Sequence, residues 1–425
     1  MSVNKHSVTL DVSKCKGCTT CIKRCPTEAI RVRNGHAVIQ EDKCIDCGEC
    51  IRHCPYQAKK AIFDKLEDFA DYKYKIAIPA PALYGQFEDL DDVDYILTAL
   101  IDCGFDDVFE VSRAAELITE YTRQYMKRKD LVKPVISTAC PAIVRLIALR
   151  FPCLLDNLLP IMPPIEYAAI LARKKALEDN PELDDEDICV LFVSPCPAKV
   201  SYVRNPIGIK KSAVTGALAI SDLYFKLRAK KKEIKTPMQL SQTGIIGLNW
   251  AGSGGEATSL LSDKYLAADG IENCINVLDQ IENGTIRDLD FVELNACNGG
   301  CVGGTLNVEN PFIAKARLRS LRKYLPISRN HIGSEENSCE SIMFDDFDKM
   351  LESAYATNAS TDRLAAIERM SAIESIYKTL PHLDCGSCGA PNCYALAEDI
   401  VKGEASETDC IIKLREIIGK GKISE

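Results

Sequence analysis

Cys15-Lys-Gly-Cys18-Thr-Thr-Cys21-Ile-Lys-Arg-Cys25-Pro26 and Cys44-Ile-Asp-Cys47-Gly-Glu-Cys50-Ile-Arg-His-Cys54-Pro55 are two runs of the chain with one spacing. In each run two, two and three residues separate four cysteines, and proline follows the last of them. Such short spacing wraps backbone amides around an iron-sulfur cluster so that they donate to its sulfurs, and the proline turns the chain away. The repeated pattern therefore predicts two clusters close to the N-terminus.

This pair of runs resembles the bacterial two-cluster ferredoxins, in which the fourth cysteine of each run ligates the other cluster. The resemblance implies one [4Fe-4S] cluster on Cys15, Cys18, Cys21 and Cys54, and a second on Cys44, Cys47, Cys50 and Cys25. Structural zinc is the alternative, because zinc ribbons also use paired cysteines. Asn34-Gly35 between two β-prone segments predicts a hairpin turn. We expect an α+β ferredoxin-like domain over residues 1–60 and a connector over 61–74.

Composition limits the compartment and the partners. The chain has 425 residues, including 21 Cys and 5 His, with a formal net charge of −9. Many cysteines without an apolar leader favour a reducing, cytoplasmic compartment over a secreted disulfide protein. No apolar window approaches the ~18 residues of a membrane span, and the acidic balance argues against nucleic acid as the main partner.

From residue 75 to about 325, short apolar runs alternate with amphipathic helical segments, which is typical of an α/β fold with parallel sheets. The expected strands are Lys75–Ile78, Val108–Val111, Pro134–Ser137, Ile188–Ser194, Gly244–Leu248 and Phe291–Asn295. Ligand sites of such sheets lie at the carboxyl ends of the strands. Three cysteine motifs follow predicted strands in this segment.

These motifs are Ser137-Thr-Ala-Cys140-Pro, Ser194-Pro-Cys196-Pro-Ala-Lys199 and Glu293-Leu-Asn-Ala-Cys297-Asn-Gly-Gly-Cys301-Val-Gly-Gly304. Together they supply four thiols, all at strand ends: Cys140, Cys196, Cys297 and Cys301. Four such thiols can converge on a single enclosed [4Fe-4S] cluster.

The three motifs, in this order, resemble those of the [FeFe]-hydrogenase catalytic domain, which are of the TSCCP, PCxxK and ACxxGCxxGG types. The resemblance implies a catalytic domain over residues 75–333, with two parallel-sheet lobes around a buried H-cluster. This H-cluster combines a [4Fe-4S] cluster with a diiron subsite that carries CO, cyanide and azadithiolate and is bridged through Cys301. Lys199 would hydrogen-bond a cyanide nitrogen, the alternative being an ordinary surface lysine. The implied reaction is reversible oxidation of H2 to protons and electrons.

Several positions depart from the efficient members of that family. Ala139 replaces the cysteine that relays protons, and Thr122 and Tyr125 align with two carboxylates of the usual route. Ser194 and Asn295 stand where methionines are common, which predicts a more polar pocket. These departures match the divergent, sensory-type branches, and we expect slow turnover.

Glu256 and Glu293 are the candidates for a different proton route. A carboxyl group in the wall of a buried metal pocket has its pKa raised towards a value suited to relay work. The alternatives are a first-turn helix acid for Glu256 and a strand-end surface acid for Glu293.

A fourth cysteine group ends the chain, with the pattern Cys385-Gly-Ser-Cys388-Gly-Ala-Pro-Asn-Cys393 followed by Cys410. It resembles the small [4Fe-4S] domain of corrinoid iron-sulfur proteins and of subunits of redox membrane complexes, with zinc again as the alternative. We expect a helical linker over 334–380, with stretches at Ser341–Ala356 and Thr361–Leu380, and a cluster domain over 381–425 that contains a helix at Ala395–Val401. The remaining cysteines have no ligand spacing: Cys103, Cys153, Cys189, Cys274 and Cys339.

The sequence thus predicts a slow, sensory [FeFe]-hydrogenase, monomeric or weakly associated, with three accessory [4Fe-4S] clusters and an H-cluster. Its expected partners are H2, protons, a ferredoxin-type redox protein, the maturation proteins that supply the diiron ligands, and a separate signalling protein. The alternative is an electron-transfer or cluster-assembly protein on the same scaffold without the diiron unit.

Overall fold

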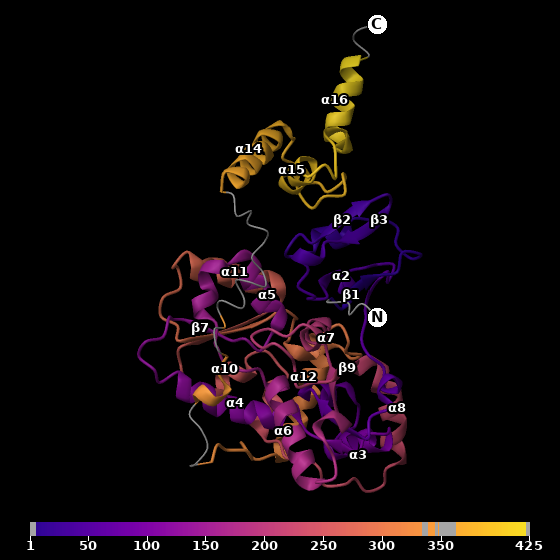
Figure 1. The fold of residues 1–425 in the computed structure, drawn as a ribbon, viewed down its shortest axis with the longest axis vertical. Coiled ribbons are helices and arrows are strands. Elements are labelled where there is room, and N and C mark those ends of the chain that lie inside the picture. The colour runs from indigo at the N-terminus through magenta and orange to yellow at the C-terminus, as the bar shows by residue number, and fades with distance from the viewer. Residues whose placement is uncertain (1–5, 334–338, 345–346, 348–362, 422–425) are drawn as a thin grey trace. The chain divides into compact units, whose positions relative to one another are not determined.

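The computed structural model describes residues 6–333, 339–344, 347 and 363–421, which form two compact units (Figure 1). The large unit comprises Ile62–Ala354 with Met1–Ser7 and Ile45–Gly48, and the small unit comprises Val8–Cys44, Glu49–Ala61 and Tyr355–Glu425. Most of the helical stretch predicted at Ser341–Ala356 lies outside the described residues.

A four-stranded parallel sheet forms one half of the large unit. Its strand order is β6 (Asp107–Val108), β5 (Tyr74–Pro79), β8 (Ile188–Ser194) and β9 (Gly216–Ala219). Every residue of β8 is buried, which explains its unbroken apolar sequence. The surrounding helices are α3 (Asp94–Asp102), α6 (Pro164–Asp179), α7 (Pro197–Arg204), α8 (Ile220–Glu233) and α12 (Pro311–Leu321).

A three-stranded parallel sheet forms the other half. It runs β10 (Tyr265–Asp269), β11 (Phe291–Asn295) and β7 (Val135–Ile136). The helices of this half are α4 (Val111–Tyr125), α5 (Pro141–Arg150), α10 (Gly255–Ser259) and α11 (Ile271–Glu282). Two parallel sheets with helices packed around them confirm the predicted α/β class.

Two of the cysteine motifs turn from a strand directly into a helix. Cys140 caps α5 after β7, Cys196 caps α7 after β8, and in both cases proline is the first helical residue. Proline suits this position because its fixed φ matches the helix and its missing N–H has no intrahelical acceptor there. Both thiols are therefore held at the carboxyl ends of parallel strands.

The strand predicted at Gly244–Leu248 is wrong, because Ile245–Asn249 forms the short helix α9. The backbone N–H groups of Ile245 and Ile246 donate to the carbonyls of Pro326 and Ile327, at 2.8 and 3.0 Å, so a distant loop replaces a sheet partner. A short apolar run does not distinguish a helix from a strand by periodicity.

The small unit joins the N-terminal cysteine runs to the last helices of the described chain. Strand β1 (Val8–Leu10) pairs with β4 (Lys59–Ala61), and β2 (Ile30–Arg33) pairs with β3 (His36–Ile39), both antiparallel. Asn34 and Gly35 have φ of 52° and 78°, which confirms the predicted hairpin turn. The helices are α1 (Thr20–Lys23), α2 (Glu49–Arg52), α14 (Arg363–Thr379), α15 (Cys393–Val401) and α16 (Ile411–Gly421).

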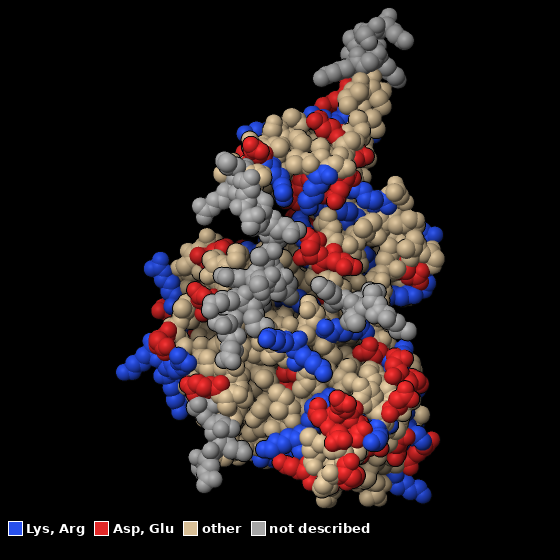
Figure 2. All heavy atoms as spheres, in the orientation of Figure 1, with Lys and Arg blue, Asp and Glu red and all other residues tan. Residues whose placement is uncertain are grey.

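The surface carries both signs of charge. Figure 2 shows acidic and basic side chains interspersed over one face of the molecule. Among the helices of the described residues, none combines the length and the apolar character that crossing a membrane requires.

Candidate functional site

A cavity opens in the large unit where the two sheets present their strand ends. The sequence-predicted residues in its wall are Ala139, Lys199, Glu256, Glu293, Asn295 and Cys301. The rest of the wall is mainly apolar, with Phe192, Val111 and several prolines. The cavity therefore brings residues of all three cysteine motifs to one place.

Lys199 and the motif thiols lie in contact beside this cavity. The Nζ of Lys199 is 3.5 Å from the Sγ of Cys301. Burial acts to lower the pKa of Lys199, but the neighbouring cysteines, Cys301 foremost, raise it overall. Burial raises the pKa of Cys196 to about 11, opposed by Lys199 and supported by Cys301 and Cys140. A buried ammonium group thus faces a set of thiols, which is a suitable environment for an anionic metal centre.

Close backbone approaches hold the third motif against its neighbours. A Cβ on Gly304 would lie 2.2 Å from the carbonyl oxygen of Pro195, directly before Cys196. A Cβ on Gly300, whose φ is +87°, would lie 2.4 Å from the amide nitrogen of Ser253. Glycine is required at both positions because any side chain would push these segments apart. Cys297 is half-buried and lies in the turn that Gly300 closes through its N–H to the Cys297 carbonyl, at 3.1 Å.

Glu256 and Glu293 form a buried pair, with 3% and 4% of their surfaces exposed. Glu293 accepts three hydrogen bonds, from the N–H groups of Gly254 and Ala257 at 2.9 Å each and from the Asn295 side chain at 2.8 Å. Burial raises the pKa of both groups, that of Glu256 to about 8 with a further contribution from Glu293. Because three donors stabilise a charge on Glu293, we assign the proton of the pair to Glu256.

Ser137 connects Glu256 to Ala139. Its hydroxyl donates to a carboxyl oxygen of Glu256 at 2.5 Å and accepts the Ala139 N–H at 3.2 Å. Ser137 is a site residue that its motif does not reveal, because nothing in the spacing of the sequence shows that Glu256 lies opposite it. Glu256 does occupy the first turn of α10, yet it is buried, and Glu293 is not a surface acid.

The other positions that depart from the expected motif residues have side chains in different surroundings. Asn295 lines the cavity, whereas the Ser194 hydroxyl binds the Cys196 backbone, donating to its carbonyl at 2.9 Å. Thr122 is buried and its hydroxyl donates to the Ile118 carbonyl at 2.9 Å, while Tyr125 packs in the core beside it. Among the cavity residues, the polarity comes from Asn295, Lys199 and the two glutamates.

Within the small unit, the predicted ligands of the first cluster line one cavity: Cys15, Cys18, Cys21 and Cys54. Backbone N–H groups point at their sulfurs, from Ala37 to Cys15 at 3.4 Å and from Ala58 to Cys54 at 3.2 Å. Such donors are what a cluster with anionic sulfurs requires.

The Nζ of Lys59 is buried in this region without a hydrogen-bond partner among the described atoms. Lys59 lines the same cavity and is only 3% exposed. In the first cysteine run the equivalent position, five residues after the last cysteine, is the apolar and buried Ile30. A buried ammonium group is costly without an anion. The cavity with its lysine therefore fits an iron-sulfur cluster.

Three predicted ligands of the second cluster, Cys25, Cys44 and Cys50, pack in the core of the small unit. The fourth, Cys47, belongs to the segment that is grouped with the large unit. At the C-terminal end of the chain, Cys388, Cys393 and Cys410 pack in one cluster and the exposed Cys385 acts electrostatically on Cys388.

The cysteines without ligand spacing have mixed surroundings, and Cys274 lies close enough to Cys140 for the two thiols to interact electrostatically. Cys189, Cys274 and Cys339 are buried, Cys103 is half-buried, and the exposed Cys153 donates to Glu282 at 2.9 Å.

Comparison with known proteins gives matches along most of the chain. The family described as iron only hydrogenase large subunit, C-terminal domain, matches residues 73–223 and 226–305. A 4Fe-4S dicluster family matches residues 7–55, and an Fe-S cluster family matches residues 380–412.

Two curated relatives are named as hydrogenases. The periplasmic [Fe] hydrogenase large subunit of Nitratidesulfovibrio vulgaris is 25% identical over 378 residues, which cover 74% of this chain and 89% of the relative. Iron hydrogenase 1 of Clostridium pasteurianum is 23% identical over 409 residues, which cover 79% of this chain and 71% of the relative. Among solved structures, an apo [FeFe]-hydrogenase from Chlamydomonas reinhardtii has a TM-score of 0.46 at 15% identity, over 66% of this chain and 91% of that chain.

Proposed function

The chain belongs to the iron-only hydrogenase family, whose large-subunit domain spans more than half of its length, and from this premise we propose that it is a slow [FeFe]-hydrogenase. The observation that carries the proposal is the contact of Lys199 with the Cys301 thiol at the cavity that the three motifs share.

The proposed ligands of the [4Fe-4S] part of the H-cluster are Cys140, Cys196, Cys297 and Cys301, with Cys301 as the bridge to the diiron subsite. When bound, the diiron unit supplies the chemistry of H2 cleavage and formation, in which H2 yields two protons and two electrons. Lys199 provides a buried positive charge for the anionic ligands of that subsite. The apolar remainder of the wall excludes water, which strengthens this interaction.

We assign proton handling to Ser137, Glu256 and Glu293. Ala139 carries no ionisable group, but its backbone N–H binds the Ser137 hydroxyl, which in turn donates to Glu256. Glu256 holds its proton below a pH of about 8 and gives it up above that value. Glu293 keeps the negative charge of the pair in place through its three donors. Because Ala139 leaves no thiol in the cavity wall to relay protons, turnover is slow.

The relay is tested by Glu256→Gln, with Glu166→Gln as a matched control. Glu166 is also buried and has a pKa raised by burial, but Ser212 and the backbone of Ala213 hold it outside the cavity wall. We expect H2 evolution to fall by about 10²-fold in Glu256→Gln and to stay unchanged in Glu166→Gln. Equal rates in both variants, at equal cluster content, would remove Glu256 from the route.

Electrons enter and leave through three accessory [4Fe-4S] clusters, two on the N-terminal cysteine runs and one on Cys385, Cys388, Cys393 and Cys410. The proposed partners are a ferredoxin-type protein and the maturation proteins that insert the diiron unit. Slow turnover with a third accessory cluster suits a sensor that reports to a separate signalling protein in a reducing, cytoplasmic compartment, although one relative is named periplasmic.

The competing function is electron transfer or cluster assembly without a diiron unit. Lys199 favours the hydrogenase, because it contacts Cys301 and also lines the large cavity beside the cysteine motifs, where the anionic ligands of a diiron subsite would need a positive charge. Matured protein should reduce a viologen dye under H2. Dye reduction that is no faster under H2 than under argon would favour the competing function.

A further inference from the structure

The C-terminal cysteine loop of the small unit lies directly against the N-terminal cysteine runs. The Val32 N–H donates to the Gly389 carbonyl at 2.7 Å, and Arg33 donates to the Cys388 carbonyl at 3.2 Å. Lys23, between Cys21 and Cys25, donates to the Pro391 carbonyl at 2.9 Å. The backbone that carries the last group of cysteines is thus hydrogen-bonded to the backbone and side chains around the first.

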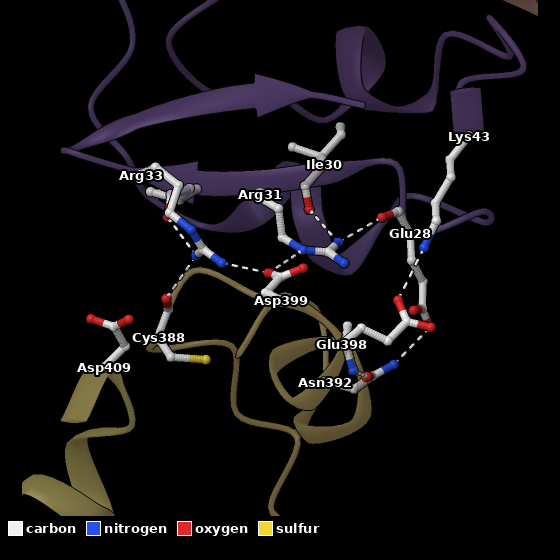
Figure 3. Close-up of polar contacts among 12 residues, drawn as sticks. Glu28, Ile30, Arg31, Arg33, Lys43, Cys388, Asn392, Glu398, Asp399 and Asp409 are labelled. Atoms are coloured by element: carbon white, nitrogen blue, oxygen red, sulfur yellow. Dashed lines mark hydrogen bonds and ion pairs between the residues drawn. The ribbon is translucent and has the colours of Figure 1, made fainter. Parts of the chain in front are cut away.

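A buried ion pair fixes this contact. Asp399 on α15 is fully buried, and one of its carboxylate oxygens pairs with Arg31 Nε at 2.7 Å and with Arg33 (Figure 3). Beside it, Lys43 pairs with Glu398 at 3.2 Å. Breaking a buried ion pair is strongly unfavourable when its charges lose their partners. The C-terminal segment therefore packs as part of the small unit, with buried charges from both ends of the chain paired at the contact.

Val32 belongs to both cysteine sites. It lines the cavity of Cys15, Cys18, Cys21 and Cys54, and its N–H binds the residue that follows Cys388. A Cβ on Gly389, whose φ is +83°, would lie 2.0 Å from the Val32 carbonyl oxygen. Only glycine allows so close an approach. A single residue thus separates the first cavity from the C-terminal cysteine loop.

We infer that the C-terminal cysteine domain is a fixed electron-transfer branch of the ferredoxin module, which exchanges electrons with the cluster of Cys15, Cys18, Cys21 and Cys54 across the contact of Val32 with Gly389. In each exchange one electron passes from a reduced [4Fe-4S] cluster to an oxidised one. No bond is made or broken and no proton moves. The inference rests on the proposed cluster content, but it does not depend on the diiron unit or on H2 chemistry.

The test is electron paramagnetic resonance of the reduced full-length protein. A Cys410→Ala variant, which lacks one C-terminal thiol, gives the signal of the chain without the C-terminal cluster. We expect the full chain to show added broadening and faster spin relaxation, because the C-terminal cluster lies close enough to interact magnetically.

Two glycine variants probe the contact itself. Gly389→Ala places a methyl group against Val32, whereas Gly403→Ala, at a similar φ of +76°, meets nothing within 4 Å and serves as the control. We expect the magnetic interaction to fall at least twofold in Gly389→Ala and to persist in Gly403→Ala. Asp399→Asn, which keeps the side-chain shape and removes the charge, should weaken the interaction in the same direction if Gly389→Ala does not fold.

Three results would overturn the inference. They are a wild-type spectrum equal to the sum of isolated clusters, an interaction equally strong in all the variants, and zinc in place of iron at Cys385, Cys388, Cys393 and Cys410. A chain without H2 activity but with the interaction would leave this inference standing and contradict only the proposed hydrogenase.

Discussion

Replacing Glu256 by glutamine should remove a pH-dependent cost to the stability of the large unit. In the folded chain the pKa of Glu256 is raised from 4.5 to about 8, first by burial and then by the charge of Glu293. The unfolded chain releases this proton near the ordinary value, so the folded state binds more protons between these two pH values. Stability from this group is therefore fully present below pH 4.5 and is lost as the pH rises towards 8.

The shift corresponds to at most about 5 kcal/mol. Glu293 shares the interaction, so we expect about half of that value in the variant. The free energy of unfolding of Glu256→Gln, relative to wild type, should rise by ~2–3 kcal/mol from pH 5 to pH 9. Trp250 is the single tryptophan of the chain and lines the same cavity, so its fluorescence follows the unfolding of this unit.

The assay is urea unfolding at both pH values, with the exposed Glu272→Gln as the control. If the free energy of unfolding of Glu256→Gln differs from that of wild type by the same amount at pH 5 and pH 9, the raised pKa of Glu256 is refuted.

Three further variants probe the rest of the site. Ala139→Cys places a thiol in the cavity wall and should raise H2 evolution about tenfold or more, measured at equal diiron content; an unchanged rate would show that proton supply does not limit turnover. Lys59→Met removes the unpartnered ammonium group from the first cluster cavity and should lower the cluster reduction potential by tens of millivolts, on the order expected for one buried charge, in a potentiometric titration. The control for Lys59→Met is the neighbouring Lys60→Met, which removes an ion pair with Asp11 at the surface. Equal reduction potentials in these two variants would contradict the placement of Lys59 beside the first cluster. Lys199→Ala should keep the iron of its [4Fe-4S] cluster but retain the diiron unit poorly, and full retention would exclude Lys199 as an anchor.

The cysteine motifs carried most of what the sequence could predict. They were predicted to follow strands, and Cys140 and Cys196 do come shortly after β7 and β8, where each caps a helix. Where the pattern was only apolar, as at Gly244–Leu248, the prediction failed, since a tertiary contact decided between strand and helix.

Contacts between segments that are far apart in the chain could not be predicted from the sequence. Ser137 and Glu256 are 119 residues apart, and nothing in either motif shows that they share a hydrogen bond. In the sequence, Asp399 is one of two adjacent acids on a short helix, and only the fold shows that it lies against Arg31 and Arg33. The sequence does contain a signal for Lys59, because this charged residue follows the second cysteine run at the position where Ile30 follows the first.

Infrared spectroscopy of the matured, anaerobically purified chain tests the central claim most directly. If Cys140, Cys196, Cys297, Cys301 and Lys199 hold an H-cluster, bands of bound CO and cyanide will appear in the carbonyl and cyanide stretching region, and these bands will weaken in Lys199→Ala at equal iron content. A chain with fully loaded [4Fe-4S] clusters and no such bands would contradict the hydrogenase assignment.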